Sequence, residues 1–169
     1  MIIILFVLSA TTGFGQHYRQ IMRSVDLDSP GNFVLKQMVG PEGDTVSIVD
    51  FIIAHVHDHS VPVYKQAFDS LEFVRENGLS DSSARLLLIG DIWKVEGKKG
   101  KVYLTEFGLA DMGTAAIAIF WVKAKDVFPL MEHYKVQDPE RSGEAINVRS
   151  FFEKRYFKSD LKEMGPWQE

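Results

Sequence analysis

Three histidines alternate with other residues in the segment AHVHDHS, at positions 55, 57 and 59. Neutral imidazole is a good ligand for Zn²⁺, Cu²⁺ and Ni²⁺. If the segment is extended, His55, His57 and His59 point to one side of the strand, because side chains alternate along it. If the segment is helical, His55 and His59 lie four residues apart on one face. In either geometry the three histidines form a candidate site for a divalent metal such as zinc or copper.

The other two histidines, His17 and His133, are further ligands that the fold could bring to this cluster. The alternative is that the three clustered histidines belong to a polar strand end before Ser60 and Pro62 and are solvated. The chain has no cysteine, which excludes a thiolate nucleophile, a Cys-ligated zinc site and a disulfide framework. We therefore expect either no cofactor or a divalent metal bound by histidine.

Two carboxylates in apolar stretches are the candidate acid or base residues. Asp91 lies in LLLIGDIW and Glu106 in KVYLTEF, and these segments face each other in a predicted hairpin. A carboxyl group among apolar side chains can hold a proton at neutral pH and act as an acid. Gly90 suggests a β-bulge, which can turn the side chain of Asp91 toward a site. The alternative for both residues is an outward position on a half-exposed strand.

The overall composition is that of one folded domain. Of the 169 residues, 46% are hydrophobic and 25% are charged, which are ordinary proportions for a globular protein. The formal net charge of −4 argues against a nucleic-acid-binding protein, in which a basic surplus is usual. The sequence also lacks the Gly-x-Ser-x-Gly, His-Glu-x-x-His and Gly-x-x-x-x-Gly-Lys motifs that mark nucleophile, zinc and phosphate sites.

The sequence opens on an apolar segment, MIIILFVLSATTGFG. Its uncharged apolar run at residues 2–10 is too short to cross a bilayer, which takes about 20 residues, but it fits the apolar region of a secretory signal. Gly13 and Gly15 supply the small side chains that signal peptidase requires, so we expect cleavage before Gln16. No Lys or Arg precedes the run, which is atypical of a signal, and the alternative is a buried first strand.

This interpretation divides the chain into residues 1–15, a secretory signal segment, and residues 16–169, a single domain. The mature protein is then periplasmic or secreted and has no transmembrane span. If the segment is not a signal, a cytoplasmic protein is expected.

Strands are predicted in two hairpins and one buried segment. Residues 32–39 and 45–56 flank the turn-forming sequence GPEGD, and residues 85–95 and 101–107 flank GKKG. Residues 114–122 form a continuous apolar run, TAAIAIFWV, which is typical of a buried strand. Tight turns between neighbouring strands require antiparallel pairing.

Residues 45–56 also fit a helix, with Ser47 and Asp50 as a capping pair. Their β-branched residues favour the strand. Helices are predicted from apolar spacing and from capping residues at residues 61–77, 126–134 and 147–164. The elements together predict an α+β fold with an antiparallel sheet of about five strands and helices packed on one face.

Aromatic residues follow both sides of the predicted C-terminal helix at Phe151, Phe152, Tyr156 and Phe157. One such stripe covers a core. The second, Phe157 with Leu161 and Met164, either covers a partner or an oligomer interface or, more commonly, belongs to one wide buried face.

Three functions are compatible with these patterns. The first is an exported, small, non-enzymatic binding or interaction domain for a protein or small ligand. The second is a metal-binding protein or metal-dependent enzyme that uses His55, His57 and His59. The third is a metal-free enzyme with Asp91 or Glu106 as acid or base. The absence of a catalytic motif favours the first function over an enzyme.

Overall fold

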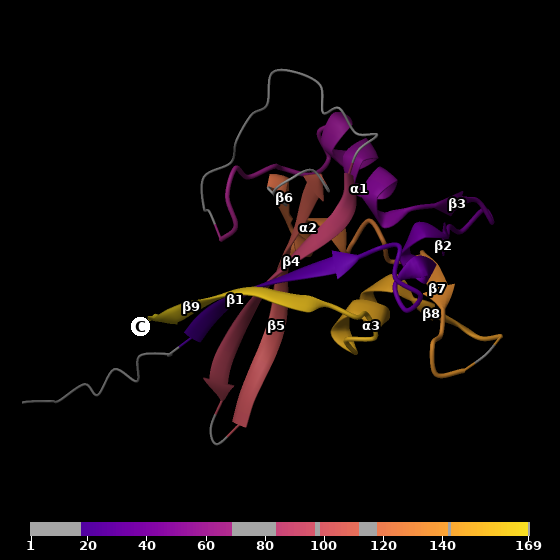
Figure 1. Cartoon of the computed structure of the whole chain (residues 1–169). Helices are drawn as coiled ribbons and strands as arrows, with labels where there is room; N and C mark the ends of the chain where they lie inside the picture. Colours follow the sequence, from indigo (N-terminus) through magenta and orange to yellow (C-terminus); the bar gives the residue numbers. More distant parts are fainter. Residues whose placement is uncertain (1–17, 69–83, 97–98, 112–117, 142, 169) are drawn as a thin grey trace, which may run out of the picture.

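The computed structural model describes residues 18–68, 84–96, 99–111, 118–141 and 143–168. The larger of its two sheets has five antiparallel strands in the order β6-β5-β4-β1-β9 (Figure 1). Its strands are β1 (Tyr18–Asp26), β4 (Ala84–Glu96), β5 (Lys99–Asp111), β6 (Ala118–Lys123) and β9 (Asp160–Gln168).

The smaller sheet has four short antiparallel strands in the order β3-β2-β7-β8. They are β2 (Met38–Val39), β3 (Thr45–Val46), β7 (Lys135–Gln137) and β8 (Ala145–Asn147). The described helices are α1 (Ile48–His57), α2 (Ala124–Val127), α3 (Val148–Glu153) and the 3₁₀ helix η1 (Phe33–Lys36). The mixed α+β class with antiparallel sheets is confirmed, and the second sheet is an addition that the sequence did not reveal. The packing of all helices on one face stays a prediction.

The two long strands β4 and β5 form the hairpin on which the larger sheet is built. Side chains alternate along a strand, and both faces of this hairpin are buried at residues 86–91 and 106–110. Leu87 and Ile89 belong to a large apolar cluster that also contains buried residues of α1, α2 and α3. Leu86 and Leu88 belong to a smaller cluster with Trp121. The sheet is therefore covered on both sides over this part of the hairpin.

Residues 45–56, for which a strand was favoured, form a short strand followed by a helix. The hydroxyl of Ser47 accepts a hydrogen bond from the backbone N–H of Asp50 at 3.0 Å and donates one to the Asp50 carboxylate at 2.6 Å. The alternative with Ser47 and Asp50 as a capping pair is thus confirmed, and the preference for a strand was wrong. Burial of the β-branched residues of α1 outweighs their weak helix propensity.

The prediction of a helix at residues 61–77 is wrong where the structure describes it. Residues 61–68 are not helical, and Tyr64 instead forms an antiparallel bridge with Trp121 through two backbone hydrogen bonds of 2.8 Å. Val61 and Val63 are both buried, as alternate residues of an extended segment can be. Residues 69–77 lie outside the described part of the chain.

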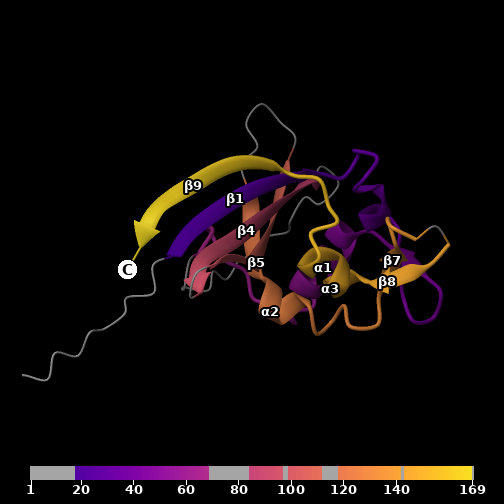
Figure 2. The same cartoon turned by 90° about the horizontal axis from the view of Figure 1, so that it is seen from below.

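The predicted C-terminal helix is also shorter than expected. The helix found there is α3, which ends at Glu153. Arg155 then takes a positive φ of 59°, and the chain continues into β9. Figure 2 shows β9 running beside β1 along the sheet. Phe151, Phe152 and Phe157 are buried in the large cluster, so they serve the core of this chain. An oligomer formed through this segment stays a prediction.

The other predicted elements are found with altered bounds. Residues 32–39 hold η1 and β2 in place of one strand, and the 126–134 helix is represented by α2 and the turns after it. The hairpin at 85–107 is confirmed, and β6 confirms a strand within 114–122, whose residues 114–117 are not described. The predicted signal segment also lies outside the described residues. No described helix is long and apolar enough to cross a membrane.

Candidate functional site

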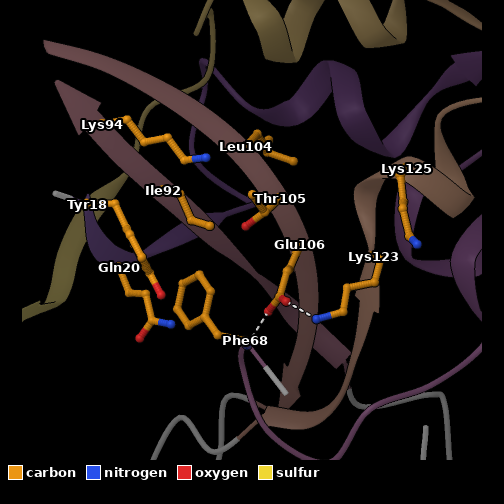
Figure 3. Close-up of a pocket in the computed structure, with 10 residues that line it drawn as sticks. All are labelled: Tyr18, Gln20, Phe68, Ile92, Lys94, Leu104, Thr105, Glu106, Lys123 and Lys125. Atoms are coloured by element: carbon orange, nitrogen blue, oxygen red, sulfur yellow. Dashed lines mark hydrogen bonds and ion pairs between the residues drawn. The ribbon is translucent and has the colours of Figure 1, made fainter. Parts of the chain in front are cut away.

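A pocket of about 640 Å³ lies on the larger sheet, where β1, β4, β5 and β6 contribute neighbouring side chains. This volume is within the usual range for small-ligand sites. Figure 3 shows its lining, which is made of Tyr18, Gln20, Phe68, Ile92, Lys94, Leu104, Thr105, Glu106, Lys123 and Lys125.

Glu106 is the only acidic residue among the described residues of this lining, and it is 2% exposed. One of its carboxylate oxygens accepts a hydrogen bond from the backbone N–H of Phe68 at 2.6 Å. The other oxygen is paired with the ammonium group of Lys123 (Figure 3). Lys123 also lies over the ring of Tyr64, with the nitrogen 4.5 Å from the ring centroid. Both oxygens of Glu106 therefore have protein partners, as a buried charge requires.

Register explains how the sheet places Glu106 in the pocket. Glu106 lies opposite Gly90 on β4 and opposite Lys123 on β6. A Cβ atom at position 90 would lie 3.2 Å from the Cβ of Glu106 and 3.4 Å from the ring of Phe68. Glycine at this position therefore leaves the space that both side chains occupy. The irregularity expected beside Gly90 is present as a shift in register. Gly90 pairs with Glu106 and Asp91 pairs with Leu104, so Thr105 has no opposite residue on β4.

Two lysines give the pocket a positive surplus. Lys123 is neutralised by Glu106, but neither Lys94 nor Lys125 has an ion-pair partner among the residues that the structure describes. The apolar part of the pocket lining consists of Ile92, Leu104 and the ring of Phe68. The pocket thus combines an apolar surface with the ammonium groups of Lys94 and Lys125.

Asp91, the other predicted acid or base, does not line this pocket. Its side chain is 0% exposed. Because Asp91 is two residues after Ile89 on β4, it points to the same face of the sheet, which is the face of the large cluster. The Nε of Arg23 donates to it at 3.2 Å, and the two terminal nitrogens of Arg155 donate to its two oxygens at 2.8 Å each. Three hydrogen bonds from guanidinium groups match an ionised carboxylate, and they give Asp91 a role in holding elements together.

The three clustered histidines lie at the C-terminal end of α1 or directly after it, and two of them take part in the contacts that end the helix. The Nδ1 of His55 is 2.9 Å from the hydroxyl oxygen of Ser60. The backbone N–H of Ser60 donates to the carbonyl of His55 at 3.0 Å, and His59 takes the positive φ of 61° that is usual for the residue ending a helix.

A common metal site for these histidines has no geometric support in the described residues. No group of three histidine or acidic side chains that could hold a metal ion is found there. His133 is exposed, and His17 lies outside the described part. Zinc or copper binding by His55, His57 and His59 stays a prediction.

Several pocket residues were missed by sequence reasoning. Ile92 and Lys94 follow Gly90 at intervals of two in the hairpin, so alternation could have placed them beside Glu106. Tyr18 and Gln20 belong to β1, which the sequence did not predict, and Phe68 comes from a segment predicted as helix. Their contribution depends on contacts between segments far apart in the chain.

Comparison with known proteins gives no further guide to the site. No protein-family model matches the chain, and no curated protein sequence matches it.

Proposed function

We propose that this chain is a non-enzymatic binding protein that holds a small ligand with an apolar body and an anionic group in the pocket around Glu106. The observation that carries the proposal is an apolar lining from Ile92, Leu104 and Phe68 beside Lys94 and Lys125, which have no ion-pair partner in the part of the chain that the structure describes. A few polar groups in a mainly apolar hollow are the usual composition of a ligand site.

The partners of the two carboxylates favour binding over catalysis. A general base must be free to take a proton from a substrate within hydrogen-bond reach. Glu106 is held by Lys123 and by the backbone of Phe68, and Asp91 is enclosed by two arginines. A substrate proton would have to compete with these partners for the oxygens of either carboxylate, so the third hypothesis is the weaker one.

Export is a separate part of the proposal. β1 begins at Tyr18, which follows the expected cleavage site at Gln16, so removal of residues 1–15 would take away none of the described strands or helices. Sequencing the N-terminus of the protein purified from the native cell tests this part. Gln16 as the first residue supports export, and an intact Met1 contradicts it.

The ligand proposal is tested with octanoate, octanol and octylammonium, which share one apolar chain and differ in charge. We expect calorimetric titration to give octanoate the highest affinity and octylammonium the lowest. An exposed ion pair contributes about 0.2–1 kcal/mol. Replacing Lys94 and Lys125 together by alanine should therefore weaken octanoate binding about 2- to 30-fold and leave octanol unchanged.

Two further variants make this test specific. Lys135→Ala removes an exposed lysine of β7, in the other sheet, and should leave octanoate binding as it is. Ile92→Trp fills the pocket and should weaken both octanoate and octanol. If octanoate does not bind, or binds equally well to the Ile92→Trp protein, the pocket is not the ligand site.

A further inference from the structure

The strand β5 is longer than its outer neighbour β6. β6 pairs with β5 only from Glu106 to Ala110, and after Lys123 the chain enters α2. Among the described residues, no strand pairs with the outer edge of residues 99–105. Figure 1 shows the β4–β5 hairpin reaching beyond the end of β6. An open edge of this kind presents unpaired backbone N–H and C=O groups on which another strand can pair.

Both sides of this open edge are hollowed. One hollow, of about 460 Å³, is lined by Val102 and Leu104 together with Phe128 and Phe152. Another, of about 300 Å³, is lined by Thr105 with residues of β4. Successive side chains of an extended peptide point to opposite sides, so a peptide paired with this edge would place every second side chain toward the larger hollow, beside Val102 and Leu104. Backbone pairing combined with such hollows is a recurring mode of peptide recognition.

The charges around the edge are mainly positive. Lys99 and Lys101 are exposed on the edge itself. The larger hollow is also lined by Lys125, Arg149 and Arg155. Its one lining carboxylate, Glu153, is paired with Arg149, and Arg155 is paired with the buried Asp91 beneath it. The surplus that remains is complementary to an acidic partner.

The same charges disfavour a second copy of this chain as the occupant. A second β5 edge would carry the same lysines and, in residues 99–105, no carboxylate, so it would not complement the positive surplus as an acidic segment does. We propose that the open edge of residues 99–105 binds an extended acidic segment of a protein partner as an added strand. The edge shares Leu104, Thr105 and Lys125 with the lining of the ligand pocket proposed above, but it is recognised through its backbone.

Hydrogen–deuterium exchange of the full chain tests the proposal, because pairing protects backbone amides directly. The probe is a synthetic peptide of about seven residues that alternates glutamate with valine, a length that matches the open edge. We expect the acidic peptide to slow exchange of the amides in residues 99–105 that face away from β4. Amides of residues 107–109, already beside β6, should be unchanged.

Two control peptides separate strand pairing from charge attraction. A peptide with lysine in place of glutamate keeps the strand propensity and reverses the charge, and it should give no protection. A glutamate–valine peptide with every backbone amide N-methylated keeps the charge and cannot add to a sheet, and it should also give none. No protection by the acidic peptide at millimolar concentration, or equal protection by either control, would overturn the proposal.

A charge variant gives a second measurement. Replacing Lys101 and Lys125 together by glutamate should weaken binding of the acidic peptide roughly tenfold or more and improve binding of the lysine peptide. The matched control Lys135→Glu should change neither affinity. Unchanged affinity in the double variant contradicts the charge argument, and if that variant does not fold, the three peptides on the unmodified chain decide the matter.

Discussion

At the scale of single residues, Asp91 shows how a buried carboxylate can be structural. Its position in an apolar run of β4 made it a candidate acid in the sequence. Its oxygens, however, accept hydrogen bonds from Arg23 of β1 and from Arg155, which follows α3. The three charged groups connect two strands and a helix end. Removing one partner of such a buried pair leaves an uncompensated charge.

We therefore expect Asp91→Asn to lower the free energy of unfolding by about 3–5 kcal/mol, measured by urea denaturation. The control is Glu153→Gln, which removes the exposed pair with Arg149 and should cost less than about 1 kcal/mol. A cost for Asp91→Asn no larger than that of the control would show that the arginine pairs contribute little.

Tyr156 gives a pH-dependent prediction. Its hydroxyl donates a hydrogen bond of 2.6 Å to the carboxylate of Glu140, and this bond raises the pKa of Tyr156 from 10.0 to about 12. A raised pKa means that the bond stabilises the fold fully below pH 10 and that this contribution is lost as the pH rises toward 12. Tyrosinate absorbance should show one late-titrating group that Tyr156→Phe removes, and titration at the ordinary value would contradict the bond.

At the scale of elements, α1 is defined by its two ends. Ser47 caps the first turn, and His59 takes the left-handed conformation after the last turn. Two of the three clustered histidines, His55 and His59, therefore take part in the way this helix ends.

The cap at Ser47 can be tested by substitution. Ser47→Ala removes the oxygen that accepts from the Asp50 N–H and should lower the free energy of unfolding by about 1 kcal/mol. Ser47→Thr keeps an acceptor and should retain most of the stability. Equal losses in the two variants, measured by thermal or urea unfolding, would mean that the hydroxyl is not the source of the effect.

The sequence predicted best the strands whose pairing partners are close to them along the chain. The β4–β5 hairpin is joined by a short glycine-containing turn, so its alternation and its turn lie in one continuous stretch. β9 was misread as helix because its pairing partner, β1, lies at the other end of the described chain, and no local pattern carries that contact. Glu106 was found as a candidate, but Lys123 and Phe68 were not, because their positions depend on β6 and on the extended segment at Tyr64.

At the scale of the whole molecule, the five-stranded sheet separates two environments. Ile89 belongs to the large cluster, and Asp91, two residues further along β4, lies on the same face of the sheet. Glu106 lies on the opposite face, near the small cluster of Leu86, Leu88, Ala110 and Trp121. A single hairpin therefore supplies a structural ion cluster to one side and Glu106 to the pocket on the other side, and both carboxylates are buried.

The place of β1 between β4 and β9 has a consequence for the order of events during synthesis. β1 emerges from the ribosome first among the described strands, yet its two neighbours are made much later, and β9 is the last of them. Until β9 is available, one edge of β1 has no neighbour in the five-stranded order, and the sheet cannot be completed. A nascent chain with this strand order would have an incomplete sheet until its last described strand has been made.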